Sequence, residues 1–433
     1  MFESILYSLV AIICLGVPSY AWRTRGRTYA IFGGVILCLS MPGTLLAAAR
    51  FEALFSPEWL PLFHALVLYC VATAGIHLAL LVRARMRSRA FRMLVSVPGQ
   101  ATVAAGFMLG VWLLAMFPVR LLFGWLGFDV GLAVLSWFDL VPILVAVVSI
   151  GTSARPVAEV VRVRLGGLAA GEAAAGPSEV SRVPVERFRG RTPAPLATRP
   201  LRIVQIADPH LGPWQSVRSL HRIVSSLLER EPDLILLTGD FLTMESMGTP
   251  GALCEALAPL RDRPGDCFAI YGNHDHEAAD EVAGALEELG VRLLVDEEAI
   301  AQTPIGPVQL VGADYVRHNV RHKRGKHLAD LLARYPRIEG HLRLMMLHDP
   351  LGFRDIAPGE IDLVLSGHTH GGQVGLVSLG LDWTVLSRSA WPDHGLFALG
   401  SNRLYVHRGT GFYGFPLRVG VPGEASMLEL ILD

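Results

Sequence analysis

The sequence has little charge and few cysteines. Lys, Arg, Asp and Glu make up 18% of its 433 residues, and the formal net charge is -1. Such a balanced chain has no basic excess to attract phosphates over a broad surface, so we expect no nucleic-acid partner. The five cysteines are odd in number and include no CxxC pair, which argues against a disulfide framework and a thiolate zinc site. No motif points to a protein partner either.

Apolar residues are abundant instead, at 52% of the chain with a mean hydropathy of +0.42. Before residue 151 they form five long stretches, at about 4–21, 29–49, 61–82, 98–119 and 128–150. Each is close to the roughly 20 residues with which a helix crosses a bilayer. A soluble all-helical domain would need polar helix faces that these stretches lack, and a cleaved signal peptide would account for only the first. Residues 1–150 are therefore predicted to be an all-α region of five transmembrane helices.

Arginines are concentrated in alternate loops between these stretches. "WRTRGR" begins at Trp22, "RARMRSRAFR" begins at Arg83, and further arginines follow the fifth stretch. The positive-inside rule places such loops in the cytoplasm. With five spans, we expect an N-terminus outside, a multi-pass protein of the cell (inner) membrane, and a cytoplasmic chain after residue 150.

The composition of residues 151–198 shifts to Ala, Gly, Pro, Arg and Glu, and we predict a linker with a possible edge strand over this range. "GGLAAGEAAAGPSE" in this range predicts a flexible linker. "VSRVPVERF", which follows it, alternates enough for an edge strand of the next domain. We expect that domain to occupy residues 199–433.

From residue 201 short apolar runs alternate with amphipathic helical segments, which is typical of an α/β domain. Five apolar runs end at side chains that can bind metal ions, in "ADPHLG", "TGD", "YGNHDH", "MLHDP" and "SGHTHGG". These side chains are Asp208, His210, Asp240, Asn273, His348, His368 and His370. Ligands of α/β domains gather beyond the carboxyl ends of the strands, and this donor set suits divalent Mn, Fe or Zn. Five unrelated polar turns are the alternative, which the repeated placement disfavours.

The closely spaced pair His368 and His370 suggests how two ions would share the site. In an extended segment these two positions point to the same side, so each imidazole is expected to reach one ion of a close pair. The glycines on either side, Gly367, Gly371 and Gly372, would let the backbone approach the cluster without a clash.

The motif set D-x-H, G-D, G-N-H-D, H and G-H-x-H resembles the calcineurin-like metallophosphoesterase superfamily over about residues 178–433. "ADPHLG", "GHTHGGQ" and "RGTGFYGFPLRVGVPGE" resemble its membrane-tethered branch, with the YkuE-like phosphoesterases and the UDP-2,3-diacylglucosamine hydrolases of lipid A biosynthesis. The resemblance implies a four-layer α-β-β-α sandwich and two divalent ions, most often Mn, with Fe, Zn or Co as alternatives. It further implies one ion on Asp208, His210, Asp240 and His370, and a second on Asp240, Asn273, His348 and His368.

A metal-dependent phosphoester or phosphoanhydride hydrolase is the function that this resemblance implies. His274, beside Asn273, is placed to protonate the leaving oxygen. Asp275 is expected to orient that imidazole or to cap the helix that follows. Two other interpretations stay open, a phosphate-sensing module without chemistry and a transporter that the second half regulates.

A lipid-linked substrate such as UDP-2,3-diacylglucosamine, reached at the membrane lipid, fits the anchored topology. Apolar residues at 374–391 and "GFYGF" at 411–415 are interpreted either as a core hairpin or as an apolar lip for acyl chains. The basic segment "RHNVRHKRGKH", residues 317–327, is either a solvated loop or a contact for headgroups or substrate phosphates.

Overall fold

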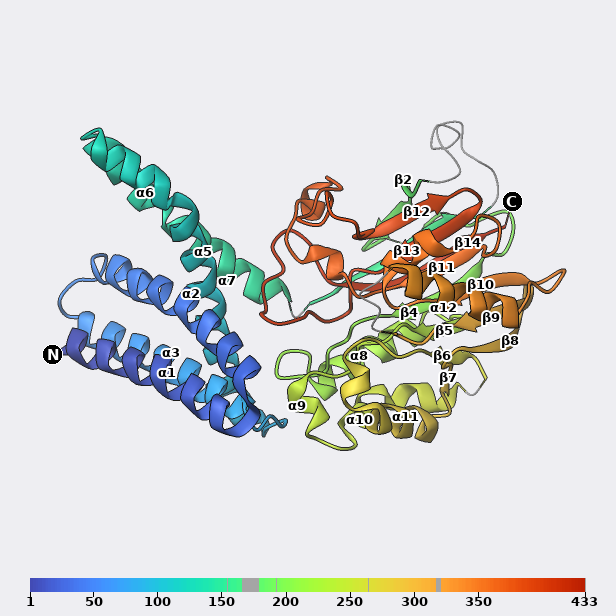
Figure 1. Ribbon diagram of the computed structural model, residues 1–433, viewed down its shortest axis with the longest axis horizontal. Coiled ribbons are helices and arrows are strands. Elements are labelled where there is room, and N and C mark those ends of the chain that lie inside the picture. Colours follow the sequence, from blue (N-terminus) through green and yellow to red (C-terminus); the bar gives the residue numbers. More distant parts are fainter. Residues whose placement is uncertain (154, 166–178, 192, 264, 317–320, 433) are drawn as a thin grey trace. The chain divides into compact units, whose positions relative to one another are not determined.

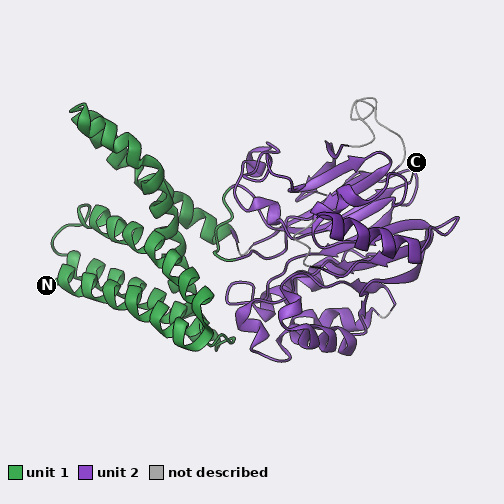
Figure 2. Ribbon diagram, in the orientation of Figure 1, with its two compact units in different colours: residues 1–152, 414–419 green, residues 153–413, 420–433 purple. Residues whose placement is uncertain are grey.

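The computed structural model describes residues 1–433 apart from 154, 166–178, 192, 264, 317–320 and 433 (Figure 1). The chain divides into two compact units (Figure 2). The helical unit contains residues 1–152 together with 414–419, and the sandwich unit contains residues 153–413 and 420–433.

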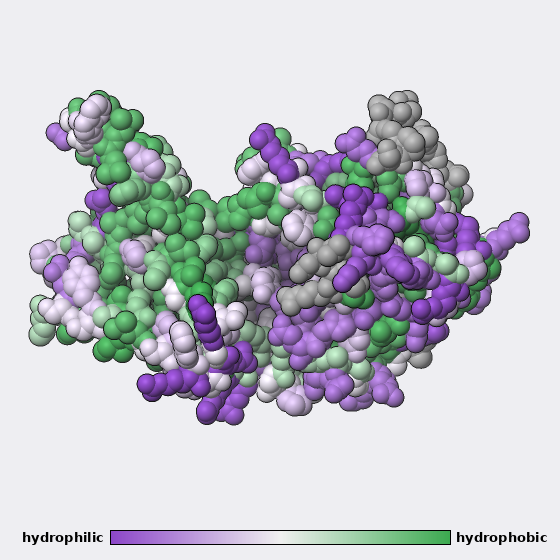
Figure 3. Space-filling model, viewed as in Figure 1, coloured by the Kyte–Doolittle hydropathy of each residue, from purple (hydrophilic) through white to green (hydrophobic). Residues whose placement is uncertain are grey.

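Five helices of the helical unit are long and apolar enough to cross a membrane, as predicted, and the face of this unit seen in Figure 3 is mostly hydrophobic. They are α1 (Phe2–Arg25), α2 (Arg27–Glu52), α3 (Leu60–Leu81), the run Arg89–Trp125 and the run Asp129–Ser153. The fourth comprises α4 (Arg89–Phe91), a π-helical turn η1 (Arg92–Ser96) and α5 (Val97–Trp125), and the fifth comprises α6 (Asp129–Phe138) and α7 (Leu140–Ser153). The fourth starts earlier than expected because the Ser88 side chain accepts a hydrogen bond from the Phe91 N–H and caps the helix within the arginine-rich loop.

Small residues bring α2 and α5 into close contact. A Cβ on Gly106 would lie 2.3 Å from the Ser40 carbonyl oxygen, and one on Gly110 would lie 1.8 Å from that of Leu39. This spacing of small residues is a common device for packing helices in membranes. Between α6 and α7 the buried Asp139 carboxylate accepts hydrogen bonds from Arg120 (2.5 Å) and from the Trp112 indole (3.0 Å). This buried charge is therefore compensated within the helical unit.

The sandwich unit is built on two seven-stranded sheets. The first sheet has the order β3 (Glu186–Arg189), β1 (Val157–Arg164), β14 (Glu424–Ile431), β4 (Leu201–Ile206), β5 (Leu234–Leu237), β6 (Cys267–Ala269), β7 (Arg292–Leu293). The second has the order β2 (Ser181–Val183), β12 (Gly395–Leu399), β13 (Asn402–Val406), β11 (Leu363–Ser366), β10 (Leu342–Met346), β9 (Gly306–Gly312), β8 (Glu297–Thr303). β4, β5 and β6 run parallel, as do β9, β10, β11 and β13, so their carboxyl ends meet at one edge of each sheet.

The core lies between the two sheets. Alternate residues such as Ile203 and Leu234 of one sheet and Leu344 and Leu363 of the other form one buried cluster. Helix α12 (Arg321–Arg334) covers the outer face of the second sheet through Leu328, Leu331 and Leu332. Helix α8 (Val217–Leu228) lies against β14 of the first sheet and is followed by α10 (Ala252–Leu257) and α11 (Ala279–Glu288). The predicted four-layer sandwich is confirmed (Figure 1).

The range 151–198, predicted as a linker, contains regular structure. Val157–Arg164 forms β1, which pairs in parallel with β14 inside the first sheet, so for these residues the linker prediction is wrong. The candidate edge strand at "VSRVPVERF" comprises two short strands, β2 and β3, each at the edge of a different sheet. The Ala- and Gly-rich stretch at 166–178 lies outside the described residues.

Candidate metal centre

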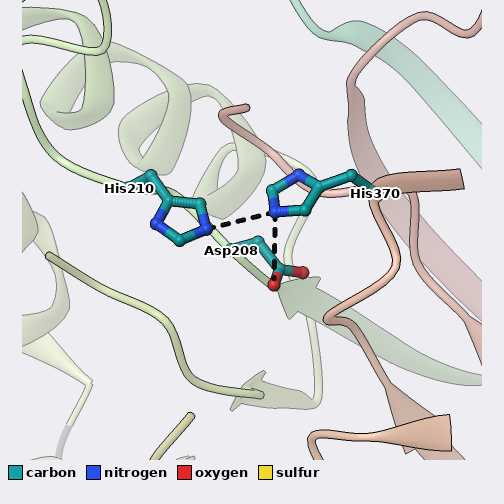
Figure 4. A group of neighbouring side chains, drawn as sticks. All are labelled: Asp208, His210 and His370. Carbon is teal, nitrogen blue, oxygen red and sulfur yellow. Dashed lines mark hydrogen bonds and ion pairs between the residues drawn. The ribbon is translucent and has the colours of Figure 1, made fainter. Parts of the chain in front are cut away.

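Two groups of metal-competent side chains converge beyond the strand ends of the sandwich. Asp208, His210 and His370 form one group (Figure 4), and Asp240, His348 and His368 form the other. Within each group the ligand atoms all lie within 4.8 Å of one another. Strands β4, β5, β10 and β11 deliver these residues, since each side chain follows the last residue of a buried strand.

The first group points its donors at a common position. The Nε2 atoms of His210 and His370 are 3.1 Å apart, and Nε2 of His370 lies 3.7 Å from the Asp208 carboxylate (Figure 4). All three residues are buried. Two imidazole nitrogens and one carboxylate oxygen, held close together and buried, are the donors that Zn²⁺, Mn²⁺ or Fe²⁺ accepts in proteins.

Asp240 lies between the two groups. Its Oδ2 atom is 3.6 Å from Nε2 of His210 and 3.4 Å from Nε2 of His348. Asn273 joins the second group, because its Oδ1 lies 3.2 Å from Nε2 of His348. A single carboxylate with a histidine of each group on either side is compatible with the resemblance, which implies that Asp240 would serve both ions. The donors therefore suit a pair of divalent ions.

The backbone of this region differs from the extended segment we expected at His368 and His370. These residues have φ angles of 69° and 52°, in the left-handed region, so the argument from strand alternation is wrong. The two imidazoles instead turn to different ligand groups, His370 to the first and His368 to the second. Asp208, His210 and Asp240 also have positive φ angles, of 48°, 43° and 58°.

Two glycines allow the ligand loops to approach each other. A Cβ on Gly367 would lie 2.2 Å from an oxygen of the Asp208 carboxylate, and one on Gly272 would lie 2.3 Å from an oxygen of Asp240. Any larger residue at either position would push a metal-binding carboxylate aside. The role expected for the glycine before His368 therefore has a direct structural basis.

Burial and the Asp240 charge set the protonation of the imidazoles. Burial lowers the pKa of His210 to about 4, and burial together with the neighbouring His348 lowers that of His368 to about 4. Burial alone would also lower the pKa of His348, but the Asp240 carboxylate raises it to about 10. Metal binding needs neutral imidazoles. His210 and His368 are therefore ready to bind an ion at neutral pH, whereas His348 must first lose its proton.

Asp275 has a different role from the two that we expected. Its carboxylate is fully buried and accepts hydrogen bonds from the backbone N–H groups of Asp240 (2.6 Å), Phe241 (2.8 Å) and Gly272 (2.7 Å). It neither caps α11 nor hydrogen-bonds to the His274 ring. It ties the loops after β5 and β6 together. Burial and the neighbouring Asp240 raise the pKa of Asp275 to about 7.

His274 is partly exposed and lies beside the ligand groups. Its backbone N–H donates to Asp240 Oδ1 (2.9 Å), and its ring lies 5.7 Å from the ring of His210. Its Nδ1 is 3.7 Å from the Glu277 carboxylate. Proton transfer from this imidazole to a leaving oxygen stays a prediction.

Tyr413 and Gln373 also belong to the site, whereas the sequence suggested only that Tyr413 could extend an apolar lip and gave Gln373 no role. The Tyr413 ring stacks on that of His274, with centroids 4.8 Å apart and planes at 25°. The Gln373 side chain donates to the Tyr413 carbonyl (3.1 Å) and accepts from the Tyr413 N–H (3.0 Å). The signals were present, since Gln373 ends "GHTHGGQ" and Tyr413 stands in "GFYGF", but only the fold brings them together.

Comparison with known proteins identifies the sandwich unit. The family model of the calcineurin-like phosphoesterases matches residues 201–372. The chain carries a calcineurin-like metallophosphoesterase domain. This family consists of metal-dependent phosphoester hydrolases.

Relatives of this phosphoesterase domain include membrane proteins. Phosphodiesterase YaeI of Escherichia coli is 29% identical over 54% of this chain and 83% of its own length. A transmembrane protein with metallophosphoesterase domain from Danio rerio is 30% identical over 57% of this chain, and the match spans only 56% of that protein. The uncharacterized metallophosphoesterase YkuE of Bacillus subtilis is 27% identical over 53% of this chain and 78% of its own length.

Proposed function

We propose that the chain is a membrane-anchored phosphoesterase with two metal ions, which hydrolyses a phosphodiester or pyrophosphate bond of a lipid-linked substrate. UDP-2,3-diacylglucosamine, a precursor in lipid A biosynthesis, is the substrate we propose to test first. The observation that carries the proposed chemistry is the Asp240 carboxylate between two buried ligand groups. We expect Mn²⁺ as the ion in the cell, although the donor set also accepts Fe, Zn or Co.

Each part of the site has a distinct role in this reaction. The ions, when bound, supply hydroxide from water and neutralise the charge that develops on the phosphoryl oxygens. Asp240 fixes the spacing of the two ligand groups, and Asp275 fixes Asp240 through its backbone N–H. His274 protonates the leaving oxygen from the rim of the centre.

Exposed apolar side chains beside the site support a lipid-linked substrate. Residues 376–385, in the loop after His370, include five of them, which we call the apolar lip: Leu376, Leu379, Leu381, Trp383 and Val385. Leu379 is 74% exposed, which a core hairpin would not allow. Phe412, by contrast, is buried, so the extension of the lip through "GFYGF" is limited to Tyr413. An exposed apolar cluster of this kind is typical of a lipid or ligand contact.

The membrane setting supports the same substrate. Five helices can anchor the chain in a bilayer, and the arginine distribution favours a cytoplasmic phosphoesterase domain in an inner membrane. Membrane lipid is then the expected partner of the helical unit, and an amphiphile dissolved in that bilayer is the expected partner of the lip.

The test compares the acylated nucleotide sugar with its deacylated form, using the full-length enzyme in detergent. Acyl chains contribute about 0.8 kcal/mol per buried CH₂, so we expect a much higher kcat/KM for the acylated form. Leu379→Ser should reduce that preference, whereas Ile300→Ser, at an exposed position of β8, should leave it unchanged. Equal kcat/KM for both substrates would contradict the lipid proposal.

A tethered general phosphodiesterase is the second candidate. The name of the YaeI relative, a phosphodiesterase, favours this candidate. In such an enzyme the membrane anchor would only localise the protein and would not select a lipid substrate. A non-catalytic phosphate sensor has less support, since such a module is expected to lose ligands and every ligand of the motif set is present here.

A further inference from the structure

A cavity of about 530 Å³ adjoins the second ligand group. His348 and His368 form part of its wall, so the cavity opens directly at the metal centre. Tyr315 also lines the cavity, and its ring centroid lies 6.0 Å from that of His348 and 6.4 Å from that of His368. A ligand in this cavity would therefore lie next to the candidate metal ligands.

Three arginines stand in the cavity wall: Arg321 and Arg324 of α12, and Arg354 of the 3-10 turn Pro350–Asp355. The Nε atoms of Arg324 and Arg321 both donate hydrogen bonds to the Asp355 carboxylate, at 2.7 Å and 3.0 Å. Arg354 donates to the carbonyl of Ala390. A guanidinium carries five N–H donors, so one such bond fixes its position and leaves most of its donors for a ligand.

The arrangement gathers like charges beside one another. Burial lowers the pKa of Arg354, and the neighbouring charges of Arg321 and Arg324 lower it further, although the Asp355 and Asp349 carboxylates act in the opposite direction. Two carboxylates also line the cavity, but both are engaged. Asp314 pairs with His276 at 3.0 Å. Asp349 accepts from the Leu351 N–H (2.9 Å) and the Trp391 indole (3.2 Å). An anion between the arginines would relieve their repulsion.

We propose that this arginine-lined cavity binds a second phosphate group of the substrate, next to the one that is hydrolysed. This inference rests on the proposed phosphoesterase function and narrows its substrate class to pyrophosphate-linked compounds. Guanidinium groups bind phosphate oxygens in pairs of parallel hydrogen bonds. The cavity lies against the candidate metal ligands His348 and His368, which fits a phosphate of the substrate better than a membrane headgroup.

The experiment measures the ratio of kcat/KM for a nucleotide sugar pyrophosphate to that for bis(p-nitrophenyl) phosphate, which has a single phosphate. The full-length, Mn²⁺-loaded protein in detergent is compared with Arg324→Gln and Arg354→Gln. Each variant should lower this ratio about tenfold or more, the scale of a hydrogen bond to a charged group. Arg337→Gln is the matched control, because Arg337 is bound to Asp362 away from the cavity, and its ratio should equal that of the wild type.

A second measurement, of anion binding, does not depend on turnover and so tests the cavity even if a variant is inactive. Methylenediphosphonate and inorganic phosphate are titrated into each protein, and the ratio of their affinities should also fall about tenfold in the two cavity variants. Ratios within twofold of the wild type in both variants would overturn the cavity proposal. A wild-type protein that binds both anions with this arginine dependence but hydrolyses neither ester would instead refute the proposed function and leave the second-phosphate site standing.

Discussion

Five of the candidate metal ligands hold a backbone conformation that residues with a side chain rarely adopt. Asp208, His210, Asp240, His368 and His370 all have φ angles between 43° and 69°. Such conformations cost on the order of 1–3 kcal/mol each and persist only where surrounding contacts fix them. Here the ligand loops fix one another: the His210 N–H donates to the Asp240 carbonyl (3.1 Å), and the His368 N–H to the Asp208 carboxylate (2.9 Å).

The separate roles of Asp240 and His274 predict two different failures. Asp240→Ala should lose both ions and all activity, because the carboxylate lies between the two groups. His274→Ala should keep both ions and lose about 10²–10⁴ in kcat, the usual effect of removing a general acid. Metal content by mass spectrometry and steady-state rates check both expectations. Normal turnover in His274→Ala would remove this residue from the mechanism.

Metal affinity should rise with pH. In the metal-free site the pKa of His348 is raised to about 10, so this ring is protonated at pH 7 and must lose its proton to bind an ion. His210 and His368, with pKa values near 4, are already neutral above pH 5 and add no dependence. Mn²⁺ affinity should therefore increase by up to about tenfold per pH unit between pH 6 and 9. Calorimetry in buffers of different ionisation enthalpy measures the released proton, and an affinity that stays constant over this range would contradict the assignment.

The residue types at the centre could be predicted from the sequence, but their neighbours could not. Each ligand follows an apolar run, so its place at a strand end is a local property. The stacking of Tyr413 on His274 joins residues far apart in the chain, and the role of Asp275 depends on three backbone N–H groups of two loops. Neither arrangement leaves a local pattern.

Among the elements, strands with uninterrupted apolar runs were predictable, and β1 was not. Its sequence "VAEVVRVR" contains the charged residues Glu159 and Arg162, and such residues are more typical of a polar linker than of a central strand. In the sheet both charges are buried and paired: Glu159 with Arg408 (2.5 Å), and Arg162 with Glu429 (2.8 Å). Buried charges are tolerated when such partners are present, and the partners come from the other end of the chain.

Asp275 links two elements, and its removal should disturb both. Asp275→Ala would leave the N–H groups of Asp240, Phe241 and Gly272 without their acceptor, at a cost of about 1–3 kcal/mol for each buried donor. We expect metal affinity to fall about 10- to 100-fold, as is common when a residue supporting a ligand is lost. Glu277→Ala, at an exposed carboxylate of the same turn, is the control. Wild-type Mn²⁺ affinity in Asp275→Ala would show that these loops hold their shape without it.

At the scale of the whole molecule, hydropathy alone was enough to predict the five helices. The place of residues 414–419 was not predictable in the same way. This segment of the C-terminal half belongs to the helical unit, where the ring of Phe415 lies 5.4 Å from that of Phe107. Hydropathy measures how a segment partitions into lipid. The position of a short loop depends instead on its packing against residues far away in the sequence, which hydropathy does not describe.

The orientation of the chain in the membrane is the remaining prediction at this scale. Arg23, Arg25 and Arg27 follow the first apolar stretch, and Arg83, Arg85 and Arg87 follow the third, whereas Arg50 after the second is offset by Glu52 and Glu58. Because basic loops are retained on the cytoplasmic side, reporter fusions after residues 92 and 160 should report the cytoplasm, and a fusion near residue 56 the outside. Replacing the first three arginines with glutamine should weaken this bias, while replacing Arg218 and Arg222 of α8 in the sandwich unit should not. An outside signal from the fusion at residue 160 would place the phosphoesterase domain on the other side of the membrane. Its substrate would then have to come from the outer leaflet or the cell envelope.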